Sequence, residues 1–76
     1  MTIKQIQSLL TYLGYNPGAV DGADGANTQT AVKRFQAAEG LGVDGIAGEQ
    51  TQAALKDAVW QERFAKDKTV PSSGHP

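Results

Sequence analysis

The stretch VDGADGANTQTAVK at residues 20–33 is repeated, with changes, as VDGIAGEQTQAALK at residues 43–56. Both copies fit the pattern V-D-G-x-x-G-x-x-T-x-x-A-x-K. The Asp-Gly pair indicates a tight turn, because aspartate can accept a hydrogen bond from the backbone two residues on and glycine tolerates left-handed backbone angles. The threonine then falls where a helix begins. The sequence therefore predicts an internal duplication of one loop-helix unit.

A first helix is predicted before the repeat, over residues 2–14. Thr2 and Gln5 have the spacing of a capping box, and Gly14 is placed to end the helix in a left-handed conformation. Apolar residues recur at helical spacing and give the helix one apolar face. These residues are Ile3, Ile6, Leu9, Leu10 and Leu13.

The first copy of the repeat predicts a second helix, capped by Asn27 or Thr28 and running to about Glu39. Gly40 ends it, and Leu41 is expected to fold back on the last turn. The apolar stripe of this helix consists of Ala31, Val32, Phe35 and Ala38.

The second copy predicts a third helix, which starts near Glu49 and continues to about Ala65, since no Gly or Pro interrupts it. We expect Val20 and Val43, which precede the two turns, to be buried anchors. Residues 66–76 contain two prolines, two serines and a glycine and are predicted to be a flexible tail or linker. The predicted fold is an all-α, small three-helix bundle over residues 1–65, with two Gly-rich loops.

Composition excludes several functions. The 76 residues include no cysteine and a single histidine, His75, which is too little for a zinc centre or a Ser-His-Asp triad. The net charge is −1 and the basic residues are dispersed, so we expect no nucleic-acid binding. No apolar run approaches the roughly 18 residues of a membrane span, and no signal peptide is visible.

Duplicated Asp-Gly loops that precede helices also suggest a calcium site. Calcium loops need alternating oxygen ligands and an acid at about the twelfth position. Counted from Asp21 and Asp44, that position is held by Val32 and Leu55. We therefore predict neither a metal nor a cofactor.

The order of these elements resembles the peptidoglycan-binding domain family. The resemblance rests on I-Q-x-x-L-x-x-L-G-Y, then V-D-G-x-x-G-x-x-T-x-x-A-V-x-x-F-Q, then V-D-G-x-x-G-x-x-T-x-x-A-L. The match covers roughly residues 3–55. It implies a three-helix module found beside amidases, carboxypeptidases, lytic transglycosylases and phage endolysins. It also implies a function: a non-catalytic module, expected to be a monomer, that targets a tethered wall-acting enzyme to peptidoglycan. The implied location is the cell wall, the outside of the cell or the periplasm, or a phage lysin that acts on the wall.

The predicted ligand site is a shallow groove formed by both loops and the two helix starts. Free backbone N–H groups there would suit carboxylates of the peptide stem, and the aspartates could meet an amine. The candidate ligand-binding residues are Tyr15, Asp21, Gly22, Asp24, Gly25, Thr28, Gln36, Asp44, Gly45, Gly48 and Thr51.

Some of these residues have two interpretations. Gln36, like Gln7, follows a core residue, so its amide either hydrogen-bonds the loop backbone or faces ligand. Tyr15 either contacts a sugar or peptide or forms a wall of the core. Asp24 has no counterpart in the second loop, where Ala47 stands, so it could carry specificity or simply be solvated. For most residues of the repeat, a purely structural role is the alternative interpretation.

Trp60 and Phe64 lie beyond the resemblance, four residues apart on the predicted last helix. They either fold back on the bundle or form a docking or sugar-stacking surface, and Arg63 with Lys66 is read as a solvated face. Docking to a partner domain is therefore the alternative function. An enzyme that uses Asp21 and Asp24 as an acid-base pair is disfavoured, because three short helices offer little cleft for a glycan.

Overall fold

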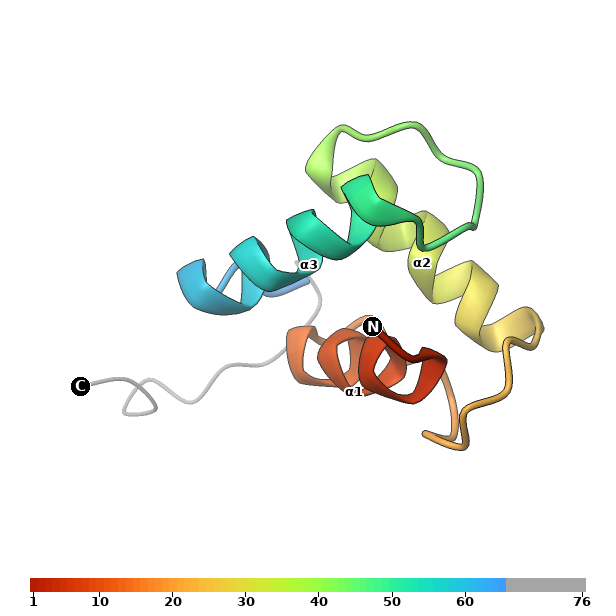
Figure 1. Ribbon diagram of the computed structural model, residues 1–76. Helices are drawn as coiled ribbons and strands as arrows, with labels where there is room; N and C mark the ends of the chain where they lie inside the picture. The colour runs from red at the N-terminus through yellow and green to blue at the C-terminus, as the bar shows by residue number, and fades with distance from the viewer. Residues whose placement is uncertain (66–76) are drawn as a thin grey trace.

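The computed structural model describes residues 1–65, and the predicted tail at residues 66–76 lies outside the described residues. The elements are α1 (Ile3–Leu13), α2 (Ala26–Glu39) and α3 (Glu49–Gln61), with no strand among the described residues. α3 lies over α1, and α1 also contacts α2 (Figure 1). The all-α three-helix fold predicted from the sequence is confirmed.

Both ends of α1 are as predicted. The Thr2 hydroxyl accepts a hydrogen bond from the Gln5 backbone N–H at 3.1 Å, and the Gln5 side chain accepts one from the Thr2 N–H at 2.8 Å, which completes the capping box. Gly14 has a φ of 94° and ends the helix, while the next N–H, of Tyr15, bonds to the Leu10 carbonyl at 2.9 Å.

The predicted N-cap of α2, Asn27 or Thr28, is wrong by two or three residues. The N-cap of this helix is Gly25, with extended backbone, and Gly48 occupies the same position before α3. Neither helix has a side-chain cap. Thr28 lies inside the first turn of α2, where its hydroxyl is directed to a residue of α1 and not to the helix start. The predicted end at Glu39, followed by left-handed Gly40, is confirmed.

The predicted end of α3 is also wrong, because the helix stops at Gln61 and not near Ala65. Glu62 takes a left-handed conformation with a φ of 55°, which turns the chain back toward α1. We call residues 62–65 the C-terminal hook. There the Ala65 N–H donates to the Leu13 carbonyl at 2.7 Å, and the Phe64 ring packs on Tyr12 with 5.4 Å between centroids. These contacts with α1 take the place of a further helical turn.

Arg63 of the hook is not the solvated residue that the sequence suggested. Its Nε and Nη2 donate to the two Glu39 carboxylate oxygens at 3.2 and 2.8 Å, and Nη2 also lies 2.9 Å from Asp57 Oδ2. The hydrogen bonds that Arg63 donates to Glu39, and next to Asp57, raise the pKa of Arg63 above its ordinary value. The hook is thereby joined to the ends of α2 and α3. Lys66, paired with Arg63 in the prediction, lies outside the described residues.

The core forms where the three helices and the hook meet. It consists of Ile6, Leu10, Leu13, Tyr15, Ala31, Val32, Phe35, Leu55, Ala58 and Ala65. The prediction that Val20 and Val43 are buried is wrong, since 37% and 54% of their surfaces are exposed. Hydrogen bonds to the loops, described below, hold the turns without these anchors. None of the helices within residues 1–65 is long and apolar enough to cross a membrane.

Phe35→Ala should destabilise the domain by about 3–5 kcal/mol, because the ring has no exposed surface and its loss leaves a cavity. Denaturant unfolding followed by circular dichroism measures the change. Trp60→Ala is the matched control, since Trp60 is 85% exposed and its removal should change the free energy of unfolding by no more than about 0.5 kcal/mol. Equal effects of the two substitutions would contradict this core.

Candidate functional site

Loop 1, residues 20–25, is held by one buried side chain, Gln7 of α1. The Gln7 amide nitrogen donates to Asp21 Oδ1 at 3.2 Å, to the Ala23 carbonyl at 2.9 Å and to the Thr28 hydroxyl at 2.9 Å. The amide oxygen accepts from the Gly22 N–H at 2.8 Å. One side chain on α1 therefore fixes both the loop and the first turn of α2.

Loop 2, residues 43–48, is held in the same way by Gln36 of α2. The Gln36 amide nitrogen donates to Asp44 Oδ1 at 2.8 Å, to the Ile46 carbonyl at 3.1 Å and to the Thr51 hydroxyl at 3.0 Å. Its oxygen accepts from the N–H groups of Asp44 and Gly45 at 3.1 and 3.0 Å. The interpretation of Gln36 as a loop-binding residue is confirmed.

The aspartate of each loop closes an Asx-turn, as predicted. Asp21 Oδ1 accepts from the Ala23 N–H, and Asp44 Oδ1 from the Ile46 N–H, both at 2.9 Å. These backbone hydrogen bonds, and next the glutamine amides, lower the pKa of Asp21 and of Asp44 below their ordinary value. The carboxylates are therefore ionised and already engaged within the loops.

Loop 2 lies close along α2, and glycine is required at position 45. Gly45 has a φ of 75°, and a Cβ added there would lie 3.0 Å from Cε of Lys33 and 3.8 Å from the Gln29 carbonyl oxygen. A larger residue would be strained by this backbone angle and would have to displace the Lys33 side chain. The equivalent Gly22 also has a positive φ, of 81°, but has more room.

The predicted site residues divide into two groups by exposure. The exposed group consists of Asp21, Gly22, Asp24, Gly25, Asp44 and Gly48. The buried group consists of Tyr15, Thr28, Gln36, Gly45 and Thr51. The hydroxyls of the two threonines and the amide of Gln36 bond within the protein, so these side chains shape the loops and present no polar atom to a polymer outside.

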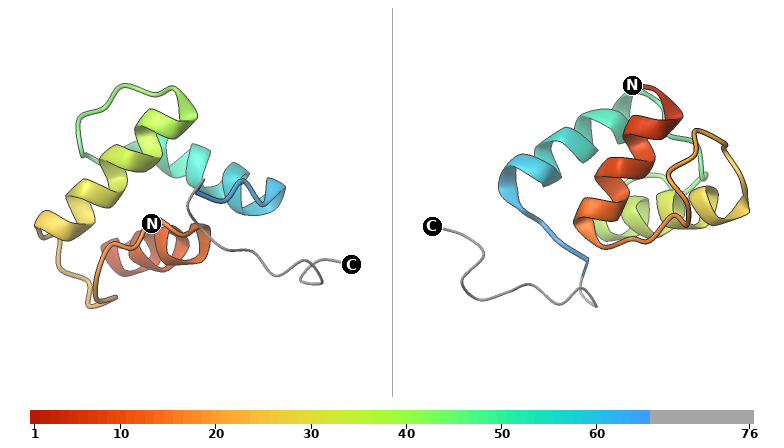
Figure 2. Two further views of the ribbon diagram at one scale, coloured as in Figure 1. Left: turned by 180° about the vertical axis from the view of Figure 1, so that it is seen from behind. Right: turned by 90° about the horizontal axis from the view of Figure 1, so that it is seen from below.

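The single groove predicted between the two loops is wrong. A hollow of about 250 Å³ lies beside loop 1 and a separate one of about 230 Å³ beside loop 2, and they share no lining residue. Tyr15 lines a third hollow. The loops lie apart because each is bound to the helix before it, loop 1 to α1 and loop 2 to α2 (Figures 1 and 2).

Tyr15 is a wall of the core and not an open stacking platform. Only 5% of its surface is exposed. Its ring meets Phe35 edge to face with 5.5 Å between centroids, and the Arg34 guanidinium carbon lies 5.7 Å from its centroid. The contacts with both neighbours leave no ring face for a sugar.

The electrostatics of the loops favour a cation over an anion. The exposed carboxylates of Asp21 and Asp24 stand before α2, and those of Asp44 and Glu49 stand around the start of α3. Negative charge at these helix starts opposes the carboxylate that free N–H groups would otherwise attract. Within residues 1–65, no group of three acidic, cysteine or histidine side chains is arranged to hold a metal ion.

Comparison with known proteins gives the family. The family model of the peptidoglycan binding domain matches residues 2–55, which include α1, α2, both loops and half of α3. The chain belongs to the peptidoglycan-binding domain family. The resemblance seen in the sequence is thereby confirmed, while the rest of α3 and the C-terminal hook lie beyond the matched residues.

Relatives of this peptidoglycan-binding domain are parts of larger enzymes. It is 39% identical over 74 residues to a spore cortex-lytic enzyme of Bacillus cereus, a match of 96% of this chain and 29% of the enzyme. It is 43% identical over 60 residues to the N-acetylmuramoyl-L-alanine amidase CwlL of Bacillus licheniformis, a match of 71% of this chain and 17% of the enzyme. No solved structure matches the chain significantly.

The chain thus spans less than a third of the length of these curated relatives. Since the shared part is a peptidoglycan-binding domain, the chain corresponds to the accessory, non-catalytic part of such enzymes and not to their catalytic part.

Gln36→Met should open loop 2 and leave loop 1 intact. Methionine has a similar size but leaves the Gly45 N–H without its acceptor, so we expect a loss of about 1–3 kcal/mol in the free energy of unfolding. Hydrogen exchange should accelerate at Gly45 and stay unchanged at Gly22. Gln7→Met is the matched control and should give the reverse pattern. Equal acceleration in both loops would show that the two glutamines do not act separately.

The lowered pKa of Asp44 predicts a pH-dependent stability. A carboxyl whose pKa is lower in the folded state stabilises the fold above its unfolded value of about 3.9, and this contribution is lost as the pH falls toward the folded pKa. Asp44→Asn keeps an acceptor for the Ile46 N–H without the ionisation. Its unfolding free energy should therefore decline less than that of wild type between about pH 5 and pH 2.

Asp24→Asn is the control for Asp44→Asn. It removes the same charge from an exposed aspartate whose side chain closes no Asx-turn. Its stability should follow the wild-type pH dependence more closely than that of Asp44→Asn. A wild-type profile for Asp44→Asn would show that the Asx-turn carboxylate does not contribute.

Proposed function

We propose that this domain holds a cell-wall-acting enzyme on bacterial peptidoglycan. The observation that carries the proposal is the match of the peptidoglycan-binding family over residues 2–55. The relatives support it, because a cortex-lytic enzyme and an N-acetylmuramoyl-L-alanine amidase both contain the same domain as a minor part of a longer chain. The module would act as a single copy, at the cell wall, whether its enzyme is secreted or belongs to a phage.

We infer that the exposed part of the loops contributes to this binding. Asp21, Asp24 and Asp44 place carboxylates at the surface, where an amine such as that of diaminopimelate could pair with them. Gly25 and Gly48 carry no side chain that would keep a ligand from the backbone of the helix starts. A single site of this kind is weak, and attachment would depend on the many identical sites of the polymer.

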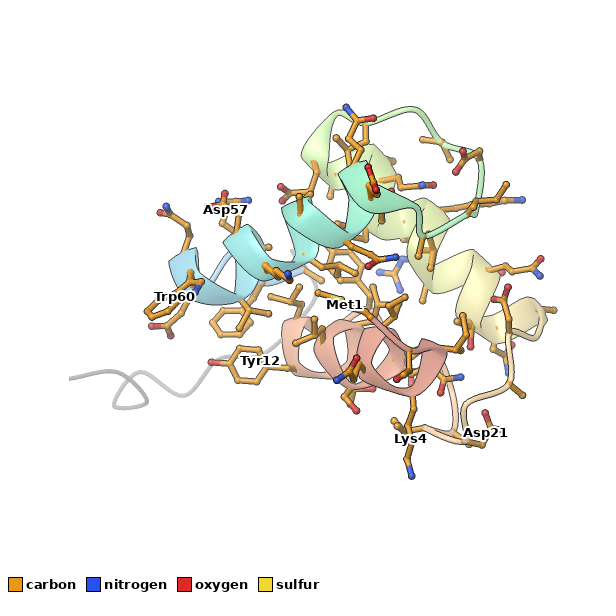
Figure 3. The ribbon with its side chains drawn as sticks, in the orientation of Figure 1. Met1, Lys4, Tyr12, Asp21, Asp57 and Trp60 are labelled. Carbon is orange, nitrogen blue, oxygen red and sulfur yellow. The ribbon has the colours of Figure 1, made fainter. Side chains whose placement is uncertain are left out.

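Docking to a partner domain is the second candidate function, and one observation favours it. Trp60 is 85% exposed, the highest fraction among the large apolar side chains of residues 1–65, and Figure 3 shows it at the same end of the molecule as Tyr12. Its large apolar surface is typical of residues at protein interfaces.

Sedimentation with insoluble peptidoglycan tests the proposed function. The chain should sediment with peptidoglycan and stay in solution with chitin, which has a related glycan but no peptide stems. Trp60→Ala should sediment as wild type does, if Trp60 serves docking. Failure of the wild-type chain to sediment with peptidoglycan would refute the proposal, and loss of sedimentation in Trp60→Ala alone would assign this residue to wall binding.

A further inference from the structure

The lysine that ends each copy of the repeat takes no part in the hydrogen bonds that hold the loops. Lys33 ends the first copy, on α2, and Lys56 ends the second, on α3. On α1, Lys4 stands three residues before Gln7, just as Lys33 stands three residues before Gln36. Each helix whose glutamine holds a loop therefore carries the same order, K-x-x-Q.

The Lys33 side chain lies against loop 2 at the Asp-Gly turn. A Cβ added to Gly45 would lie 3.0 Å from the Lys33 Cε and 3.5 Å from its Cγ. Since each further bond adds about 1.5 Å, the Lys33 ammonium lies within roughly 6 Å of the Gly45 Cα. Asp44, the preceding residue, is exposed. An ammonium group and a carboxylate thus flank one turn.

Loop 1 has the same combination of charges. A Cβ added to Gly22 would lie 4.0 Å from the Lys4 Cβ, and Figure 3 shows the Lys4 side chain and Asp21 at the same, lower side of the molecule. The ion pairs within residues 1–65 are those of Arg63, and neither Lys4 nor Lys33 pairs with an acid there. At each turn the two opposite charges therefore stand beside each other without direct contact.

Each turn also has a carboxylate oxygen available to a ligand. The glutamine amide and the Asx-turn N–H both bond to Oδ1, of Asp21 in loop 1 and of Asp44 in loop 2. Both aspartates are exposed, so Oδ2 can accept a charge-assisted hydrogen bond from an amine outside the protein.

The lysines determine which kind of amine suits the turns. When the carbon that bears an amine also bears a carboxylate, the acids of the loop attract the amine and repel the carboxylate. Lys33 beside loop 2, and Lys4 beside loop 1, supply a positive charge that offsets this repulsion. A ligand with an amine alone gains nothing from the lysine. The pair of charges is therefore complementary to a zwitterion.

We propose that each loop is a subsite for a zwitterionic amino-acid end, with the aspartate of the turn binding the amine and Lys4 or Lys33 binding the carboxylate. The side-chain end of diaminopimelate in a peptide stem has this chemistry, whereas a lysine in the stem has the amine alone. The inference rests on the proposed function and adds the class of stem and the residues that select it. The duplication then provides two such subsites, one at each loop.

Lys56 is a control that the repeat itself supplies. It has the position in α3 that Lys33 has in α2, and it is also exposed. No Asp-Gly turn follows it in the chain, and it lines a different hollow, between α1 and α3. Lys56 therefore has the same charge and the same local sequence pattern as Lys33 without a turn to serve.

The test is a titration of the full, isotope-labelled chain with three soluble muropeptides, followed through amide chemical shifts. Their stems contain diaminopimelate with a free side-chain carboxylate, diaminopimelate with that carboxylate amidated, or lysine. The Gly22 amide reports binding at loop 1 and the Gly45 amide reports binding at loop 2. At both loops we expect the free-carboxylate stem to bind about tenfold more tightly than the other two, because only it pairs with the lysine.

Lys33→Gln should remove this preference at Gly45 and keep it at Gly22, and Lys4→Gln should do the reverse. Lys56→Gln makes the same change in net charge and should keep both preferences. A merely structural role of either lysine would weaken the three muropeptides equally and leave their ratio unchanged. All three lysines are exposed, and the shift dispersion of each variant reports whether it is folded.

Equal affinity of wild type for the three muropeptides would overturn the zwitterion subsites, as would a folded Lys33→Gln that keeps its preference at Gly45. If wild type sediments with peptidoglycan but shows no preference among the muropeptides, the subsites are refuted and the proposed function stands. If wild type fails to sediment with peptidoglycan that contains diaminopimelate, both are refuted.

Discussion

Two buried glutamine side chains, Gln7 and Gln36, connect the helices to the loops. The conformation of both loops, and the position of the helix start that follows each loop, depend on them. A side-chain amide has two N–H donors and an oxygen that accepts. With one N–H shared between two acceptors, a single glutamine binds a carboxylate, a carbonyl and a hydroxyl through its nitrogen and a backbone N–H through its oxygen. Both glutamines are almost fully buried, and their polar groups must be satisfied inside the protein. The two loops supply the partners, which fixes the conformation of each.

This arrangement explains why the chain contains the same turn twice. In each unit the glutamine precedes the Asp-Gly turn and the threonine follows it, and all three meet through the amide. The repeat is therefore a unit of helix, loop and helix start, longer than the 14-residue pattern that first reveals it. Because each loop is bound to its own preceding helix, the duplication produces two separate hollows, and no shared groove is formed.

The C-terminal hook adds a feature that the repeat does not contain. It lies beyond the residues matched by the family and returns to α1 through Ala65, while Arg63 ties it to α2 and α3. These contacts close one side of a hollow that Ala37 and Ala38 of α2 also line. The hook thus adds contacts to a small core and forms a surface that the repeat by itself does not provide.

The sequence by itself determined the parts that depend on interactions between near neighbours. The capping box at Thr2, the left-handed glycine at Gly14 and the Asx-turn at Asp44 each involve residues no more than a few positions apart, so their spacing is visible in the chain. The fold class and the family follow from these local patterns and from the helical periodicity. The pairing of Gln36 with the loop was one of two interpretations, since the sequence does not give the direction of a side chain.

Only the tertiary structure decided which residues meet across the molecule. The hook forms because Glu62 adopts a left-handed conformation that its sequence does not favour. Contacts of Phe64 and Ala65 with α1, more than 50 positions earlier in the chain, stabilise it. The pairing of Arg63 with Glu39 spans 24 positions. Val43 is exposed because the Gln36 amide, and not an apolar contact of Val43, holds loop 2 in place. The position of Arg34 at an apolar hollow has no sequence signal, because long-range packing alone brings α2 and the hook together.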